Sequence, residues 1–158
     1  ALACIERVAM ALPIVVDEPD DIGARTVMLA GAVLGGRCLQ NASMGVHHGL
    51  SQLVGGRTGI AHGLANGLIL AHAMRFNRDA VPGELDRIGA ALGDPDDAAA
   101  AVDRLRERVG LPAGLSDCGV DDGDIEAVAR MAPGNPNVQA NPKPVTEADA
   151  RRILEDAY

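Results

Sequence analysis

The sequence predicts an all-α protein whose helices pack as a bundle. Its 158 residues are 47% hydrophobic but include one Tyr, one Phe and no Trp, so aliphatic side chains and alanine must fill the core. Such side chains suit closely packed helices better than sheets, which favour aromatic and β-branched residues. No alternating strand pattern stands out. A chain of this length buries one core, so we expect a single helical domain.

The first predicted helix covers the opening stretch ALACIERVAMALPIVV, in which Leu2, Ile5 and Leu12 lie at helical spacing. No Ser, Thr, Asp or Asn precedes this stretch to cap the helix, and the chain does not start with Met. Because the helix lacks its beginning, we expect the chain to be part of a longer protein.

The second predicted helix, IGARTVMLAGAVLGGRCLQNA, follows a capping aspartate at Asp20 or Asp21. Glycine inside a helix costs roughly 0.5–1 kcal/mol relative to alanine, so the glycines here need a compensating close contact with another helix. We therefore expect this to be the central helix of the bundle. The residues of its small-residue face are Ala24, Val27, Met28, Gly31, Ala32 and Gly35.

Shorter helices are predicted in the rest of the chain. The stretch GGRTG breaks the third helix from the fourth, and Pro or Asp residues start the three that follow. Pro133–Pro144 is rich in proline and asparagine, which predicts an extended loop without a regular helix. Thr146 and Asp149 then form a capping box that starts a last helix. The predicted spans before the loop are Met44–Val54, His62–Phe76, Pro82–Leu92, Asp96–Val109 and Val120–Ala132.

Charge and cysteine usage exclude several classes of protein. A formal net charge of −8, without a Lys/Arg cluster, argues against a nucleic-acid partner. Cys4, Cys38 and Cys118 are widely spaced, so neither a disulfide framework nor a thiolate zinc site is predicted. No stretch approaches the roughly 20 apolar residues of a membrane span, and no signal-peptide pattern opens the chain. We expect a cytoplasmic protein without a membrane or nucleic-acid partner.

All four histidines fall within a single glycine-rich window, at positions 47, 48, 62 and 72. His48 and Gln52 share one helical face, whereas His47 points roughly 100° away. Because glycines separate the third and fourth helices, we expect these helices to set His48 facing His62. Two neutral imidazoles on rigid helices form half of a site suited to Fe²⁺ or Zn²⁺.

The histidine window also has a purely structural interpretation. Zinc normally takes at least three protein ligands, and no HxxxH or HExxH motif completes this set. On that alternative, His48 and His62 are partly buried histidines bonded to backbone carbonyls. We expect His72 to be structural, and His47 to lie at the surface or behind the metal ligands.

The stretch HHGLSQLVGGRTGIAHGLANGLILAHAMRFN resembles the helical-domain signature of the iron-containing, group III alcohol dehydrogenase family, which has a dehydroquinate synthase-like fold. Two outer stretches, PDDIGARTVMLAGAVLGGRCLQNASMG and ANPKPVTEADARRILEDAY, are similar to the family's preceding helix and closing segment. The paired histidines and the ending resemble the maleylacetate reductase branch, whereas HGLAN is more typical of alcohol dehydrogenases.

This resemblance implies an NAD(P)-dependent oxidoreductase with two domains. Residues 1–158 are similar to the C-terminal helical domain, which carries the metal and substrate site, while the N-terminal α/β domain that binds most of NAD(P) is absent from this chain. The implied substrate is a small carbonyl compound, an alcohol or an unsaturated dicarboxylate, and the implied assembly is a homo-oligomer. The chain alone is expected to be inactive, because it has no glycine-rich nucleotide turn.

The resemblance also implies roles for single residues. Two of the family's four metal ligands are histidines spaced fourteen apart, which fall on His48 and His62, while an Asp and a His are expected upstream of Ala1. The metal is Fe or Zn, although maleylacetate reductases are similar proteins in which metal dependence is lost. Gln52 stands where the family usually has a histidine assigned to proton relay. Gln52 is thus the predicted catalytic position, but glutamine cannot titrate and acts only through hydrogen bonds.

Two further points stay open at the level of sequence. Arg57, in the loop between the histidine-bearing helices, is a candidate for contact with an anionic substrate or else a solvated loop arginine. Ala61 replaces the proline that usually precedes the second ligand, which removes only a preset φ at the helix start. An alternative from another class is a stand-alone helical domain that binds a metal or another subunit without catalysis.

Overall fold

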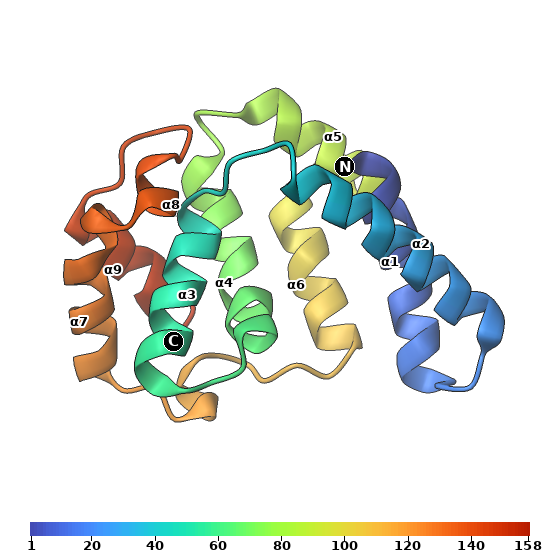
Figure 1. Ribbon diagram of the computed structural model, residues 1–158, viewed down its shortest axis with the longest axis horizontal. Coiled ribbons are helices and arrows are strands. Elements are labelled where there is room, and N and C mark those ends of the chain that lie inside the picture. The colour runs from blue at the N-terminus through green and yellow to red at the C-terminus, as the bar shows by residue number, and fades with distance from the viewer. The chain divides into compact units, whose positions relative to one another are not determined.

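The computed structural model describes residues 1–158. It contains nine α-helices, α1–α9, two short 3₁₀ turns, η1 and η2, and no strand, so the all-α prediction is confirmed (Figure 1). The elements are α1 (Leu2–Asp17), α2 (Ile22–Leu39), α3 (Val46–Thr58), α4 (His62–Asn77), α5 (Pro82–Leu92), α6 (Ala98–Arg108), η1 (Ser116–Cys118), α7 (Asp122–Met131), η2 (Ala132–Gly134), α8 (Pro136–Gln139) and α9 (Glu147–Asp156).

The helices group into two compact units. The first is formed by Ala1–Ala42 and Gly83–Gly110, and the second by Ser43–Pro82 and Leu111–Tyr158. The chain therefore leaves the first unit after α2 and returns to it for α5 and α6. All four histidines belong to the second unit.

In the first unit, α2 packs against α1 through its small residues. A Cβ placed on Gly31 would lie 3.2 Å from Val8 Cγ2. Glycine at this position therefore lets α1 approach α2 closely, and this contact compensates for the poor helix preference of glycine. The predicted close helix contact is therefore confirmed. An aspartate side chain starts α2 as predicted, because Asp21 accepts a hydrogen bond from the backbone N–H of Ala24 at 2.8 Å.

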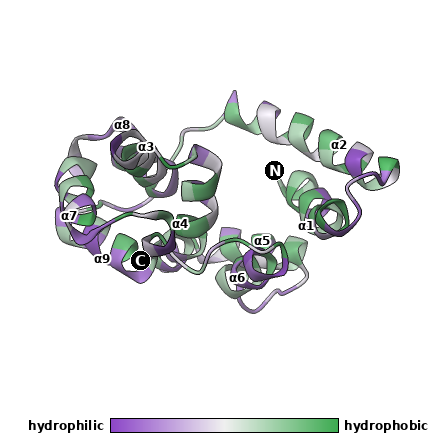
Figure 2. Cartoon of the chain, turned by 90° about the horizontal axis from the view of Figure 1, so that it is seen from below, coloured by the Kyte–Doolittle hydropathy of each residue, from purple (hydrophilic) through white to green (hydrophobic).

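The predicted central position of α2 is wrong. Only Ala24 and Gly31 of this helix are buried, while Ile22, Leu29 and Val33 are 74%, 69% and 66% exposed. Figure 2 shows hydrophobic, green-coloured stretches along this helix. The pattern of small residues correctly identified one narrow face of α2, against which α1 packs. Such a pattern does not indicate how many other helices contact α2. The larger apolar residues of α2 lie away from that contact.

The helix α2 also corrects the expectation that no segment has membrane-spanning length. Ile22–Leu39 is 18 residues long with a mean hydropathy of 1.3, which is long and apolar enough to cross a bilayer. Length and composition alone do not make it a span, because helices of soluble proteins meet the same criteria.

The main apolar core lies in the second unit, around α3 and α4. These helices pack against each other, and α7, α8 and α9 cover them. Fully burying a leucine or valine contributes about 1.5–3 kcal/mol, so this cluster is the principal source of stability for the histidine-bearing helices. Its completely buried large side chains include Leu50, Val54, Leu68, Ile69, Leu115, Val128 and Leu154.

The boundary between α3 and α4 lies later than predicted. Gly55 and Gly56 stay helical, and α3 ends at Thr58 because Gly59 adopts a left-handed φ of 78°. The backbone N–H of Gly59 donates to the carbonyl of Gly55 at 2.9 Å, which satisfies the helix end. Gly59, whose φ is positive, therefore ends α3. Gly55 and Gly56 do not end the helix, although glycine lowers the helix preference of its last turns.

The predicted loop Pro133–Pro144 contains one helical turn, so the expectation of no regular helix there is wrong. Asn135 caps α8 by accepting hydrogen bonds from the backbone N–H groups of Asn137 and Val138. Proline at the first helical position costs no hydrogen bond, which makes Pro136 a suitable start. The capping box predicted for α9 is confirmed, since Thr146 and Asp149 exchange side-chain and backbone bonds.

Candidate functional site: a facing histidine pair

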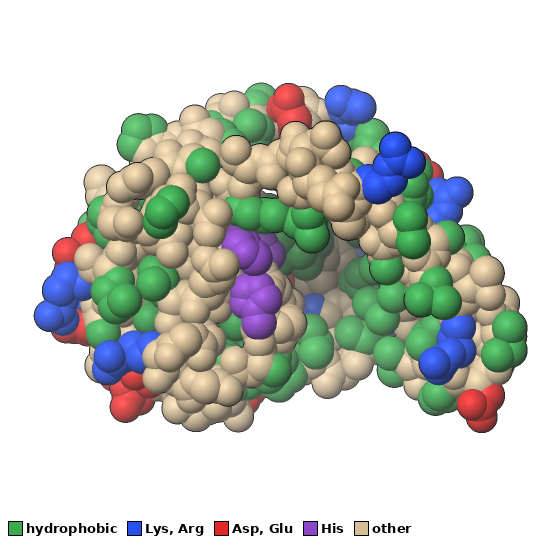
Figure 3. All heavy atoms as spheres, in the orientation of Figure 1, with side chains coloured by type: hydrophobic (Ala, Val, Ile, Leu, Met, Phe, Trp, Pro, Cys, Tyr) green, Lys and Arg blue, Asp and Glu red, His purple; other side chains and the backbone are tan.

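His48 and His62 lie side by side in the second unit. His48 is in the first turn of α3 and His62 is the first residue of α4. Their ring centroids are 5.0 Å apart, and the ring planes are perpendicular. Figure 3 shows histidine side chains reaching the surface as one patch. The proximity predicted from the fourteen-residue spacing is confirmed, while the metal role of the pair stays a prediction.

The surroundings of His48 favour its neutral imidazole. Partial burial lowers the pKa of His48, and the neighbouring His62 lowers it further. Metal ions bind the neutral ring, so a lowered pKa keeps His48 ready to bind over a wider pH range.

His47 lies closer to the pair than predicted. Its ring is half-buried, and its Nε2 is 3.0 Å from the carbonyl oxygen of Asn66 on α4, so Nε2 carries the proton that is donated. Asn66 Nδ2 in turn donates to the carbonyl of His62 at 2.7 Å. Burial lowers the pKa of His47, partly offset by the bond to Asn66. His47 is therefore not a surface residue but a hydrogen-bonded link between α3 and α4, and His72 lies half-buried further along α4.

Gln52 follows His48 by one helical turn and is exposed. Together with Ile60 and His62 it lines an open surface depression floored by Gly55 and Gly56. Its Oε1 accepts a hydrogen bond of 2.8 Å from Nδ2 of Asn137 on α8. Asn137 is 85 residues away in sequence and sits in a stretch that we predicted to be loop, so no local signal pointed to it.

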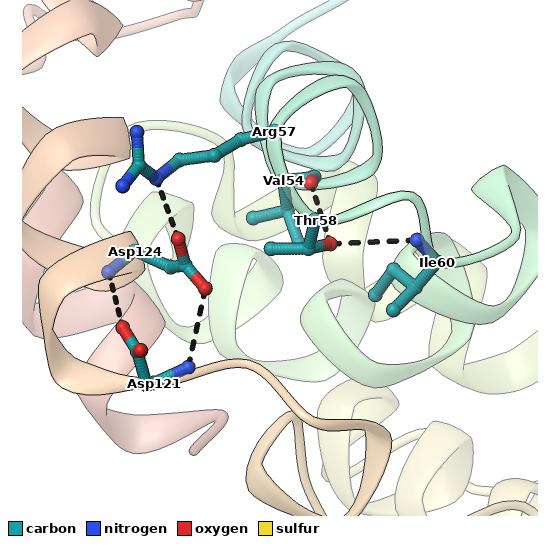
Figure 4. Close-up of polar contacts among 6 residues, drawn as sticks. All are labelled: Val54, Arg57, Thr58, Ile60, Asp121 and Asp124. Carbon is teal, nitrogen blue, oxygen red and sulfur yellow. Dashed lines mark hydrogen bonds and ion pairs between the residues drawn. The ribbon is translucent and has the colours of Figure 1, made fainter.

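Arg57 is engaged away from this depression. Its Nε lies 2.6 Å from Oδ1 of Asp124, and Figure 4 shows the guanidinium directed toward the start of α7. Asp124 is itself held by the capping box with Asp121. Arg57 lies in the last turn of α3, not in a loop, and ties α3 to α7. It does not line the depression that Gln52 and His62 share, so contact with an anionic substrate there has no support. Its side chain is 43% exposed, in keeping with the alternative of a solvated arginine.

The histidine pair offers two nitrogen donors for a metal ion. No group of three or more His, Cys, Asp or Glu side chains lies close enough to hold a metal ion. Two nitrogen donors at this separation fit part of a Zn²⁺ or Fe²⁺ site, which needs at least a third protein ligand. By itself the pair is therefore an incomplete donor set for either metal.

The all-α fold is that of a helical domain found in oxidoreductases of known structure. The chain matches 1,3-propanediol oxidoreductase with a TM-score of 0.95 and 29% identity, covering 99% of this chain and 44% of that one. It matches maleylacetate reductase from Agrobacterium tumefaciens with a TM-score of 0.91 and 30% identity, again covering 99% and 44%. Residues 1–158 match the model of the Fe-containing alcohol dehydrogenase family, C-terminal, and the chain belongs to this family.

Sequence relatives fall into the two branches that the sequence resembles. The chain is 36% identical to maleylacetate reductase 2 of Cupriavidus pinatubonensis over 156 residues, which cover 98% of the chain. It is 29% identical to 1,3-propanediol dehydrogenase of Klebsiella pneumoniae over 168 aligned residues, which cover 100% of the chain. In both cases it spans 43% of the relative's length.

Proposed function

We propose that this chain is the metal-binding and substrate-binding domain of an NAD(P)-dependent oxidoreductase, and that His48 and His62 are two of its metal ligands. The observation that carries this proposal is the pair itself, with ring centroids 5.0 Å apart on consecutive helices. Family membership and the names of the relatives in both branches support it. The substrate is a small carbonyl compound, an alcohol or an unsaturated dicarboxylate.

The residues of this chain bind and orient, while the redox chemistry comes from bound groups. Iron or zinc supplies Lewis-acid stabilisation of charge on a substrate oxygen, and NAD(P), held mainly by another domain, supplies or takes the hydride. His48 and His62 donate ring nitrogens, and the link from His47 through Asn66 keeps α3 and α4 in register. Gln52 hydrogen-bonds to a group in the depression without exchanging a proton.

The domain arrangement is part of the proposal. A nucleotide-binding domain and two further metal ligands would be supplied from outside this chain, in a cytoplasmic and homo-oligomeric enzyme. The apolar side chains exposed on α1 and α2 support burial of this surface in a larger assembly, since Ile22 and Leu29 are among the most exposed. The alternative function, a subunit-interaction domain without catalysis, would use the same exposed apolar surface of α1 and α2 to bind another subunit.

The test uses the complete gene product. We expect it to contain close to one equivalent of Fe or Zn per subunit, and to turn over maleylacetate with NAD(P)H or 1,3-propanediol with NAD(P)⁺. A chelator should abolish turnover, and added metal should restore it. The 158-residue chain alone should show no turnover. Intact mass distinguishes the two functions, because a natural protein of this length with bound metal but no activity would support the non-catalytic domain instead.

A further inference from the structure

The orientation of the Gln52 amide is set by a residue on another helix. A glutamine amide has one acceptor end and one donor end, and Oε1 of Gln52 already accepts from Asn137 Nδ2 at 2.8 Å. This bond turns Oε1 toward Asn137, so the NH₂ group is the end of Gln52 directed away from Asn137. Gln52 lines the open depression together with His62, so a donor is available beside the histidine pair.

The position of Asn137 is fixed by the packing of α8. Asn135 caps this short helix, and Pro136 starts it with a preset φ. Gly49 lets α8 approach α3, because a Cβ on Gly49 would lie 2.5 Å from Cγ2 of Val138. Asn137 is thus held next to Gln52 by the backbone of a capped turn seated on α3.

The depression has few other polar groups. Its remaining lining residues are Gly55, Gly56 and Ile60, which contribute no polar side chain. Arg57, the arginine of α3, forms an ion pair with Asp124 and does not line the depression. Among the side chains of this chain, a ligand in the depression therefore meets one amide donor from Gln52 and the ring of His62.

We propose that Asn137 is a positioning residue that turns the NH₂ group of Gln52 toward the substrate, and that the substrate group bound there is a carbonyl or carboxylate oxygen. Such oxygens only accept hydrogen bonds, which matches a donor whose own acceptor is engaged. An amide cannot exchange a proton, so Gln52 contributes a hydrogen bond to this oxygen and no acid or base. This inference rests on the proposed function and narrows its substrate class to compounds that place a carbonyl or carboxylate oxygen next to Gln52.

The test replaces Asn137 in the complete protein. Asn137→Asp removes the donor and leaves an acceptor, so Gln52 should rotate to donate to the new carboxylate and present Oε1 to the substrate. We expect KM for maleylacetate to rise about tenfold or more, with a smaller change in kcat and unchanged metal content, because one well-placed hydrogen bond is lost. Gln52→Glu keeps the bond from Asn137 but removes the donor, and should raise KM in the same way.

A charge control and a binding measurement separate positioning from general damage. Ala140→Asp adds the same charge to the exposed end of α8, where the side chain is not bonded to Gln52, and should leave KM within about twofold. Maleate, an unsaturated dicarboxylate that is not reduced, should shift the Gln52 side-chain amide signals in NMR spectra of the wild type but not of Asn137→Asp. 1,3-Propanediol, which has no carbonyl or carboxylate oxygen, should shift them less.

Each possible result bears on the inference. An unchanged KM in a folded Asn137→Asp protein, a matching rise in Ala140→Asp, or Gln52 signals that respond to the diol and not to maleate would overturn it. Failure of the proposed function has a different signature, namely metal content that does not depend on His48 and His62. The maleate titration needs no turnover, so it decides the orientation of Gln52 even in a protein that reduces neither substrate.

Discussion

The rings of His48 and His62 face each other edge to face, with centroids 5.0 Å apart, although α3 runs for ten more residues beyond His48 before α4 begins. The turn at Gly59 returns the chain so that the first residue of α4 meets the first turn of α3. Histidine side chains form a patch on this face of the molecule (Figure 3).

Removing either ring should remove the metal. We expect His48→Ala and His62→Ala in the complete protein to weaken metal affinity by more than about 100-fold, because loss of a mere hydrogen-bond partner of a ligand already costs 10–100-fold. His72→Gln, on the same helix α4 but outside the pair, is the control and should keep its metal. Elemental analysis after dialysis gives the readout, and full metal content in both alanine variants would remove the pair from the site.

The capping box at the start of α9 should contribute measurably to the free energy of unfolding. Oγ1 of Thr146 accepts from the backbone N–H of Asp149 at 3.1 Å, and α9 buries Ile153 and Leu154 in the core. Thr146→Ala should lower the free energy of unfolding by about 0.5–2 kcal/mol, measured in urea. Thr26→Ala is the matched control, because Thr26 lies inside exposed α2 and only donates to the carbonyl of Ile22. Equal losses in both variants would show that the cap contributes nothing specific.

The same cap predicts a pH dependence. The hydrogen bond from the Thr146 hydroxyl, followed by that from its backbone N–H, lowers the pKa of Asp149 from its usual 3.8. A carboxyl whose folded pKa is below its unfolded value stabilises the fold above the unfolded pKa, and this is lost as pH falls through the folded pKa. The difference in unfolding free energy between wild type and Asp149→Asn should therefore be constant above about pH 5 and shrink as the pH falls below that, through the folded pKa. A constant difference would mean that the ionised carboxylate is not what stabilises the cap.

Local chemistry made part of this structure predictable. The capping box of α9 and the proximity of His48 and His62 depend on residues close in sequence, and both appear as expected. Contacts between distant segments were not predictable: Gln52 is bonded to Asn137, 85 residues away, and Arg57 to Asp124, 67 residues away. The helix α8 was not predicted because proline and asparagine usually indicate a loop. Here Asn135 caps the helix and Pro136 is its first residue. A helical wheel gives the angle of His47 but not the helix that its ring contacts, so its bond to Asn66 could not be predicted.

The seat of α8 on α3 depends on a single missing Cβ, which the last prediction tests. A Cβ on Gly49 would lie 2.5 Å from Cγ2 of Val138 and 3.1 Å from Oδ1 of Asn135, so alanine must push α8 outward or distort its cap. Gly49→Ala should lower the free energy of unfolding by about 1–3 kcal/mol, as overpacking does.

Gly56, on the same helix, is the matched control for Gly49. Nothing lies within 4 Å of its Cβ position, so Gly56→Ala should stabilise the chain by about 0.5–1 kcal/mol through the helix preference of alanine. Urea unfolding of the two variants gives both values. A shift of α8 in Gly49→Ala should also move Asn137 away from Gln52. The NMR signals of the Gln52 side-chain amide should therefore change in Gly49→Ala and stay unchanged in Gly56→Ala. Stabilisation by both alanines would show that α8 does not need the glycine, and that Asn137 is held by its own capped turn alone.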